Sequence, residues 1–114
     1  MLPLPLPLPR RMAPELLDGL AAEDPRAQRS RVDLRRIHRA MATLSTVLRA
    51  LDRGTVGFVP HTFLELGAGD ASMMLRIARR RARRWPNARV TLLDRVQVVA
   101  PRTVDALGRL GWTT

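Results

Sequence analysis

The alternation of hydrophobic and polar positions divides the chain into helical and extended segments. Apolar residues recur at helical spacing over 30–52, and this periodicity predicts one long amphipathic helix. Short apolar runs over 63–66 and 90–93 predict two strands. Helical periodicity returns after each strand segment, over 71–84 and over 101–110. Strands that alternate with helices in this way are typical of an α/β fold with parallel strands.

The residues before the first strand segment predict a different organisation. Leucine and proline alternate over residues 1–9, and proline fixes φ and lacks an amide donor, so this stretch predicts a polyproline-like extension. Residues 14–22 suggest a short helix, which the segment 23–26 interrupts. Ser30 is then expected to cap the long helix, and Gly54 to end it. We expect three parts: a disordered Leu-Pro-rich tail over 1–13, an N-terminal helical segment over 14–54 and a strand-containing domain over 55–114.

A glycine turn follows the first strand segment. Gly67 and Gly69 interrupt the apolar run, and the helical pattern begins directly afterwards. A strand, a tight glycine turn and a helix form the first half of a nucleotide-binding βαβ unit, in which a ligand approaches the main chain at the helix start. Glu65 and Asp70 beside this turn would repel a pyrophosphate and attract a cation. Asp94 follows the second strand segment, where this fold type places an acceptor for ribose hydroxyls, roughly 20 residues beyond the glycines.

Both places resemble the class I methyltransferases that use S-adenosylmethionine (SAM). Residues 64–71, Leu-Glu-Leu-Gly-Ala-Gly-Asp-Ala, are similar to the first motif of that family, although its third glycine is Ala71 here. The resemblance implies a Rossmann-like methyltransferase fold with SAM as the cofactor. It assigns the glycine turn to the methionine part of SAM, the acids beside it to the positive charge, Asp94 to the ribose and the next two residues to the adenine. The implied cofactor-binding residues are Glu65, Gly67, Ala68, Gly69, Asp70, Asp94, Arg95 and Val96.

The resemblance covers about residues 30–112, which is less than a complete enzyme of this kind. The family fold has about seven strands and commonly some 200 residues or more. We therefore expect a partial fold, truncated before the third strand, and no catalytic residue can be assigned because the acceptor pocket would lie beyond residue 114. The arginine-rich segment 35–39 resembles the front helix of methyltransferases that act on small molecules. A small-molecule acceptor is therefore the expected substrate, and this chain alone is expected to be inactive.

The charge of the chain leaves other functions open. The net charge is +10, and all twenty basic residues are arginine. Arginine forks bind phosphate, so an RNA-binding fragment or the front half of an RNA methyltransferase is an alternative, with the arginine run over 76–84 as its surface. Codon bias in a GC-rich genome gives the same composition, and we prefer it because few aromatic side chains offer base stacking. A third alternative is a non-catalytic remnant that folds only with a partner supplying further strands.

Several classes of site find no support in the sequence. A chain without cysteine has no disulfide framework and no zinc–thiolate site, and no metal site is predicted. No apolar run has membrane-spanning length and no secretion signal is recognisable, so a cytoplasmic location without a membrane partner is expected.

His38 is expected on the polar face of its helix, and His61 at the end of the first strand opposite to ligand-binding sites. Trp112 either folds back onto the sheet or stays exposed.

Overall fold

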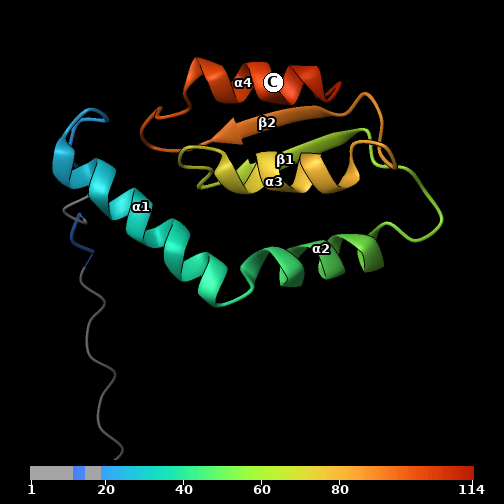
Figure 1. Ribbon diagram of the computed structural model, residues 1–114, viewed down its shortest axis with the longest axis horizontal. Helices are drawn as coiled ribbons and strands as arrows, with labels where there is room; N and C mark the ends of the chain where they lie inside the picture. Colours follow the sequence, from blue (N-terminus) through green and yellow to red (C-terminus); the bar gives the residue numbers. More distant parts are fainter. Residues whose placement is uncertain (1–11, 15–18) are drawn as a thin grey trace, which may run out of the picture.

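Two strands form the centre of the fold, with helices packed beside them. The computed structural model describes residues 12–14 and 19–114. The elements follow in the order α1 (Pro25–Ala40), α2 (Thr43–Gly54), β1 (Thr62–Leu66), α3 (Ser72–Arg81), β2 (Arg89–Leu93) and α4 (Pro101–Arg109), as labelled in Figure 1. The described residues thus form a small α/β domain with four helices and two strands. This confirms the α/β class that the sequence predicts, with both strands and the last two helices in the expected places.

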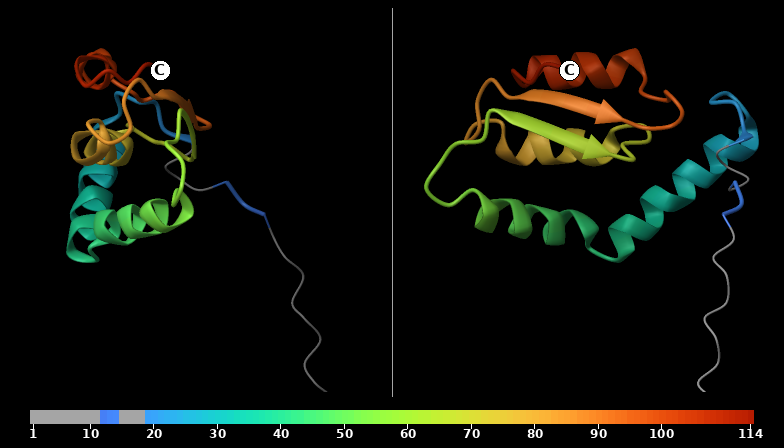
Figure 2. Two further views of the ribbon diagram at one scale, coloured as in Figure 1. Left: turned by 90° about the vertical axis from the view of Figure 1, so that its right-hand side faces the viewer. Right: turned by 180° about the vertical axis from the view of Figure 1, so that it is seen from behind.

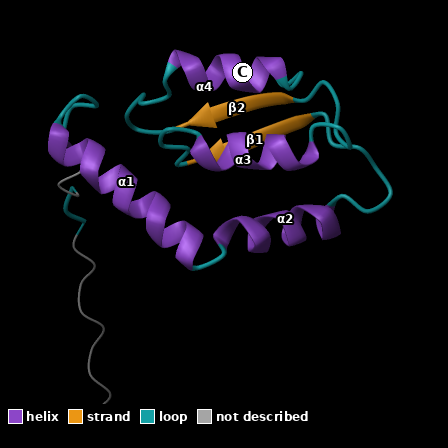
Figure 3. Ribbon diagram, in the orientation of Figure 1, coloured by secondary structure: helices purple, strands orange, loops and turns teal. Residues whose placement is uncertain are grey.

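The two strands are parallel and fully in register. Thr62 pairs with Arg89 at one end and Leu66 with Leu93 at the other, and both arrows point the same way in Figure 3. The carboxyl ends of both strands therefore meet at one edge of the sheet, where parallel α/β sheets bind ligands. His61 precedes β1 and its carbonyl accepts the N–H of Arg89 at 2.8 Å, which places it at the opposite edge, as expected.

One face of the sheet is covered and the other is open. Side chains alternate between the faces of a strand. Phe63 and Val90 pair across the two strands and pack into the hydrophobic core, and α3 and α4 lie on one side of the sheet in Figure 2. On the opposite face Leu64, Leu66 and Leu93 are 62%, 69% and 55% exposed. Two strands with helices on one side thus leave an apolar face uncovered by any described residue.

Three aromatic rings form the centre of the covered face. The ring of Phe63 stacks on Trp112, with 4.9 Å between centroids, and lies 5.7 Å from the ring of Trp85. The indole Nε1 of Trp112 donates a buried hydrogen bond of 2.9 Å to the carbonyl of Trp85. Both tryptophans are almost completely buried. Of the two positions expected for Trp112, the structure therefore shows the one against the sheet.

The expected helix over 30–52 is wrong, because the chain turns in its middle. Ala42 has the left-handed φ of 51°, and its N–H closes a turn onto the carbonyl of Arg39. The apolar stripe also divides there: Leu44 is buried in α2, whereas Ile37 and Met41 are 51% and 70% exposed. The turn lets α2 pack beside α3, while the beginning of α1 lies near the carboxyl edge of the sheet (Figure 1).

The start of the first helix also differs from the prediction. Asp24 caps α1 by accepting the N–H of Arg26 at 2.8 Å, and Pro25 occupies the first helical position. Ser30 therefore lies inside the helix and does not cap it. An Asp-Pro pair can end a preceding segment or start a helix, and here it starts α1. Of the expected helix over 14–22, residues 15–18 lie outside the described residues and residues 20–22 are not helical; most of the expected tail also lies outside the described residues.

The helix α2 is fixed to α3 by a forked ion pair as well as by its leucines. Asp52 accepts hydrogen bonds from Nε and an Nη atom of Arg81 at 2.9 and 2.7 Å. Arg81 also lies over the ring of Trp85, 6.0 Å from its centroid. The bond to Arg81 holds the pKa of Asp52 below its ordinary value. One arginine of the basic run therefore joins two helices and is not part of a free basic surface.

The last residues of the chain lie along the second edge of β2. The N–H of Val90 donates to the carbonyl of Thr113 at 2.7 Å, and the N–H of Thr113 donates to the carbonyl of Ala88 at 3.0 Å. Thr113 thereby forms a parallel bridge with Arg89. Because successive N–H groups of a strand point to opposite sides, this contact lies on the side of β2 away from β1.

Within the described ranges no helix is both long and apolar enough to cross a membrane.

Candidate functional site

The turn after β1 has the backbone that its glycines predict. Gly67 and Gly69 have φ values of +68° and +55°, in the left-handed region that favours glycine. The N–H groups of Gly67 and Ala68 both donate to the carbonyl of Leu93, at 2.7 and 3.1 Å. A Cβ added at either glycine would meet nothing within 4 Å. The glycines are thus needed for the backbone angles, and the space beside them is open to a ligand.

Asp94 lies directly beside this turn. Its carboxylate accepts the N–H of Gly69 at 2.7 Å and the N–H of Val96 at 3.4 Å. The bond from Gly69 is the main reason why the pKa of Asp94 is lowered, so the group is ionised at neutral pH. The side chain stays exposed to solvent. The two motifs that the sequence separates by more than twenty residues are therefore one hydrogen bond apart.

Glu65 is the acid of the site that lacks a partner. It lies on the same face of β1 as Phe63, the covered face, and its Oε2 is buried without a hydrogen bond to any described residue. Burial raises the pKa of Glu65 to about 7, and the negative charge of Asp70 adds to the rise. A carboxylate in this position would gain from a cation placed nearby, because a positive charge would restore its lost solvation.

Asp70 is occupied by other residues of the chain. It accepts the N–H of Ser72 at 3.0 Å and forms an ion pair with Arg35 of α1. Burial acts to raise the pKa of Asp70, but the bonds from Ser72 and the charge and hydrogen bond of Arg35 outweigh it and lower the pKa. The Arg35 charge thus largely compensates Asp70, which also attaches α1 to the glycine turn.

Half of the predicted cofactor-binding residues line one cavity. This cavity has a volume of about 420 Å³ and runs along the second edge of β2, and it includes Ala68, Gly69, Asp94 and Val96. Glu65, Gly67, Asp70 and Arg95 do not line it, although each of them is within a few residues of those that do. The structure therefore gathers all eight residues at the carboxyl edge but puts only four in the same hollow.

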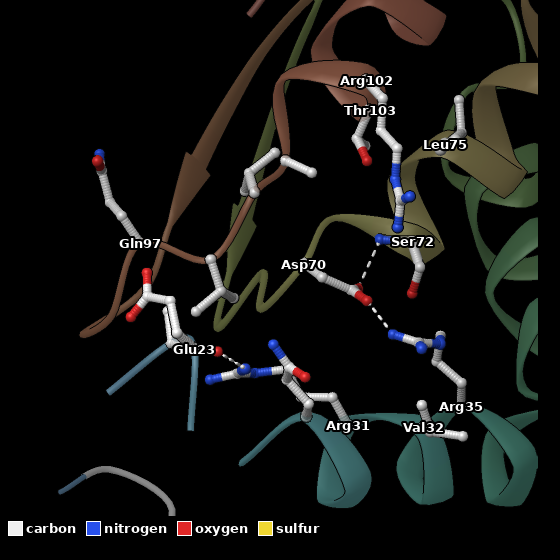
Figure 4. Close-up of a pocket in the computed structure, with 15 residues that line it drawn as sticks. Glu23, Arg31, Val32, Arg35, Asp70, Ser72, Leu75, Gln97, Arg102 and Thr103 are labelled. Carbon is white, nitrogen blue, oxygen red and sulfur yellow. Dashed lines mark hydrogen bonds and ion pairs between the residues drawn. The ribbon is translucent and has the colours of Figure 1, made fainter. Parts of the chain in front are cut away.

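A second and larger cavity lies between α1 and the starts of α3 and α4. Its volume is about 810 Å³, and Figure 4 shows side chains from all three helices around it. Asp70 is the one predicted site residue in its wall. Sequence reasoning missed Arg31, Gln97 and Arg102, which also line it. The spacing of Arg31 and Arg35, four residues apart on one helix face, is the signal that would have indicated part of this wall.

The remaining candidates do not join either cavity in a way that suggests catalysis. His38 is exposed on α1, as expected, and lies beside a smaller hollow with Arg76 and Arg79. Among the described residues, no group of three or more His, Asp or Glu side chains could hold a metal ion. Within the part of the chain that the structure describes, the arrangement offers binding groups: an ionised acceptor, an acid whose buried Oε2 has no partner, and open glycine backbone. No protein-family model, no curated protein and no solved structure matches the chain.

Proposed function

We propose that this chain binds SAM at the carboxyl edge of its sheet and is the cofactor-binding part of a SAM-dependent methyltransferase. The observation that carries the proposal is the hydrogen bond of 2.7 Å between the N–H of Gly69 and the carboxylate of Asp94. It holds an ionised carboxylate, which could accept ribose hydroxyls, beside a glycine turn with open space next to its main chain. The resemblance in sequence at 64–71 and 90–94 agrees with this geometry.

The charges at the edge favour a cationic cofactor over a dinucleotide. A pyrophosphate beside the turn would lie close to the ionised carboxylate of Asp94, whose charge would repel it. The sulfonium and ammonium of SAM would instead be attracted, most of all by Glu65, whose buried Oε2 has no partner among the described residues. The carboxylate of Asp94 would accept hydrogen bonds from the ribose hydroxyls, either in place of the Gly69 N–H or in addition to it.

The chain's own residues would bind and orient the cofactor. Transfer of a methyl group from a sulfonium needs mainly proximity and alignment of the acceptor, because the sulfonium is already a good leaving group. We propose a small molecule as the acceptor and the cytoplasm as the location, as the sequence interpretation has it. No general base is assigned to any residue of the chain.

Titration calorimetry of the full chain with SAM tests the proposal. We expect micromolar binding that Asp94→Ala weakens by about ten- to a hundredfold, which is the effect of one or two hydrogen bonds to a charged group. The matched control is Asp105→Ala, which removes an exposed aspartate from α4 outside both cavities. Circular dichroism checks that each variant is folded. Equal binding by Asp94→Ala and the unaltered chain, or no binding by the folded chain, would refute the proposal.

RNA binding is the second candidate, and one observation favours it. Arg79, Arg80 and Arg83 are exposed on α3 and the turn after it, whereas the neighbouring Arg81 is held by Asp52. These three arginines form no ion pair with any described residue, so they could contact phosphates. An RNA affinity that falls steeply with salt and is lost in a variant with all three replaced by glutamine would favour this function.

A further inference from the structure

The cavity of about 810 Å³ has a positively charged wall built from two separate helices. Arg31 and Arg35 reach it from α1, and Arg102 reaches it from the first turn of α4. In Figure 4 the Arg102 side chain extends toward Ser72 and Asp70, opposite the two arginines of α1. The guanidinium groups thus approach one space from two sides, although more than sixty residues of sequence separate them.

The charges in this wall do not cancel. Arg35 is neutralised by its ion pair with Asp70. Arg31 donates to the carbonyl of Ala22 at 3.0 Å, and its charge also acts on Asp94, whose pKa it helps to lower. Arg102 makes no hydrogen bond or ion pair with any described residue. The other acid of the wall is Glu23, which Figure 4 shows away from Arg102, so three arginines against two acids leave one positive charge, at the Arg102 side.

Neutral donors and apolar groups complete the lining. Ser72 and Thr103 are hydroxyl-bearing residues of the same wall, and α4, which begins at Pro101, has no side-chain cap at Ala100. At the first turn of α4 the N–H of Arg102 donates to no described residue, whereas Pro101 has no N–H and Thr103 donates to the carbonyl of Ala100 at 2.9 Å; this one group adds to the attraction of the Arg102 side chain for an anion. Val32 and Leu75 are apolar parts of the same wall. A volume of this size holds a whole small molecule, with an acid group at one end and hydrocarbon along the other.

This cavity adjoins the hollow beside β2 that contains Gly69 and Asp94. Gln97 and Val99 line both, so the loop after β2 forms the wall between them. We propose that the larger cavity binds the acid group, a carboxylate or a phosphate, of the molecule that receives the methyl group, with Arg102 as its principal contact. The identification of the bound molecule as the methyl acceptor rests on the proposed function, whereas the binding of an anion in the cavity does not depend on it.

Amide chemical shifts of the full chain, followed by NMR during titration with inorganic phosphate and separately with succinate, test the inference. Ionic strength is kept constant because salt screens all twenty arginines alike. We expect saturable shifts at Ser72, Arg102 and Thr103, and the stronger of the two probes identifies the acid. Arg102→Gln should weaken this binding about five- to tenfold, since it removes a charge-assisted hydrogen bond. Arg109→Gln, at the far end of the same helix, should leave it unchanged.

Addition of SAM to the same samples separates the two proposals. Shifts at Gly69 and Asp94 with unchanged phosphate or succinate affinity would support an acceptor site beside the cofactor. Anion binding without any SAM binding would overturn the acceptor assignment together with the proposed function. Competition between SAM and phosphate, together with weaker binding of SAM by Arg102→Gln, would overturn the acceptor assignment but not the proposed function, because the cavity would then hold the carboxylate of the cofactor. Shifts spread over arginines throughout the chain would overturn the site itself.

Discussion

Replacing Glu65 by glutamine tests the physical state of the acid that lacks a partner. Burial is the main cause that raises the pKa of Glu65 from 4.5 to about 7, and the charge of Asp70 adds to it. The folded chain therefore holds a proton that the unfolded chain releases in the same pH range. Glutamine keeps the shape of the side chain and cannot ionise, so the difference between the two proteins isolates this one group.

The sign and the size of the effect follow from linkage. Between pH 4.5 and 7 the folded state binds more protons than the unfolded state, so stability falls as pH rises through this window and is constant above it. A rise from 4.5 to about 7 corresponds to about 3 kcal/mol at about 1.4 kcal/mol per pKa unit. Solvent screening of this half-buried carboxyl reduces the expected loss to about 1–2 kcal/mol.

Urea unfolding of both proteins at pH 5 to 8 measures the effect. We expect the free energy of unfolding of the unaltered chain to decline relative to Glu65→Gln by about 1–2 kcal/mol across this range. Asp52→Asn is the control: the pKa of Asp52 is lowered by Arg81, so its loss should shift the whole profile by a constant amount. Parallel profiles for the unaltered chain and Glu65→Gln would refute the reasoning and place the carboxyl in contact with water.

Two further predictions concern stability and use the same unfolding assay. Gly69→Ala should destabilise the chain by about 1–2 kcal/mol, because Gly69 has a left-handed φ of +55°. Gly54→Ala should be neutral or stabilising, because Gly54 lies at the end of α2 and a Cβ there meets nothing within 4 Å. Equal effects of the two substitutions would contradict the backbone argument. Trp112→Phe should cost about 1–3 kcal/mol, because the buried carbonyl of Trp85 loses its donor. A change below about 0.5 kcal/mol would show that water replaces the indole.

The elements that sequence patterns predict well are those with clear boundaries. Both strands are short apolar runs, the first ended by Gly67, and α4 starts at the proline that suits a first helical turn. The break between α1 and α2 could not be foreseen in this way. Ala42 takes a left-handed angle that alanine rarely adopts, and neither glycine nor proline marks the place. Packing of α2 against α3, with Asp52 on Arg81, determines the turn, and periodicity along the chain contains no information about that contact.

The candidate site divides along the same line. The contact between Gly69 and Asp94 could be inferred, because the carboxyl ends of two parallel strands must meet at one edge. The role of Arg35 could not, because its ion pair with Asp70 depends on the direction in which α1 leaves the turn at Ala42. Arg102 belongs to the same class: its position opposite α1 is a property of the tertiary structure alone.

Ala71 shows how far the glycine turn tolerates a departure from the motif it resembles. It takes the place of the third glycine and has a φ of +61° with its side chain completely buried. A left-handed angle in alanine costs about 1–2 kcal/mol, and the buried methyl group returns about 0.8 kcal/mol of that. The hydrogen bonds of the turn, from Ala71 to the carbonyl of Ala68 at 2.9 Å and from Gly69 to Asp94, hold the angle in place. The turn geometry is therefore imposed by hydrogen bonds within the turn and to Asp94, and it does not require a third glycine.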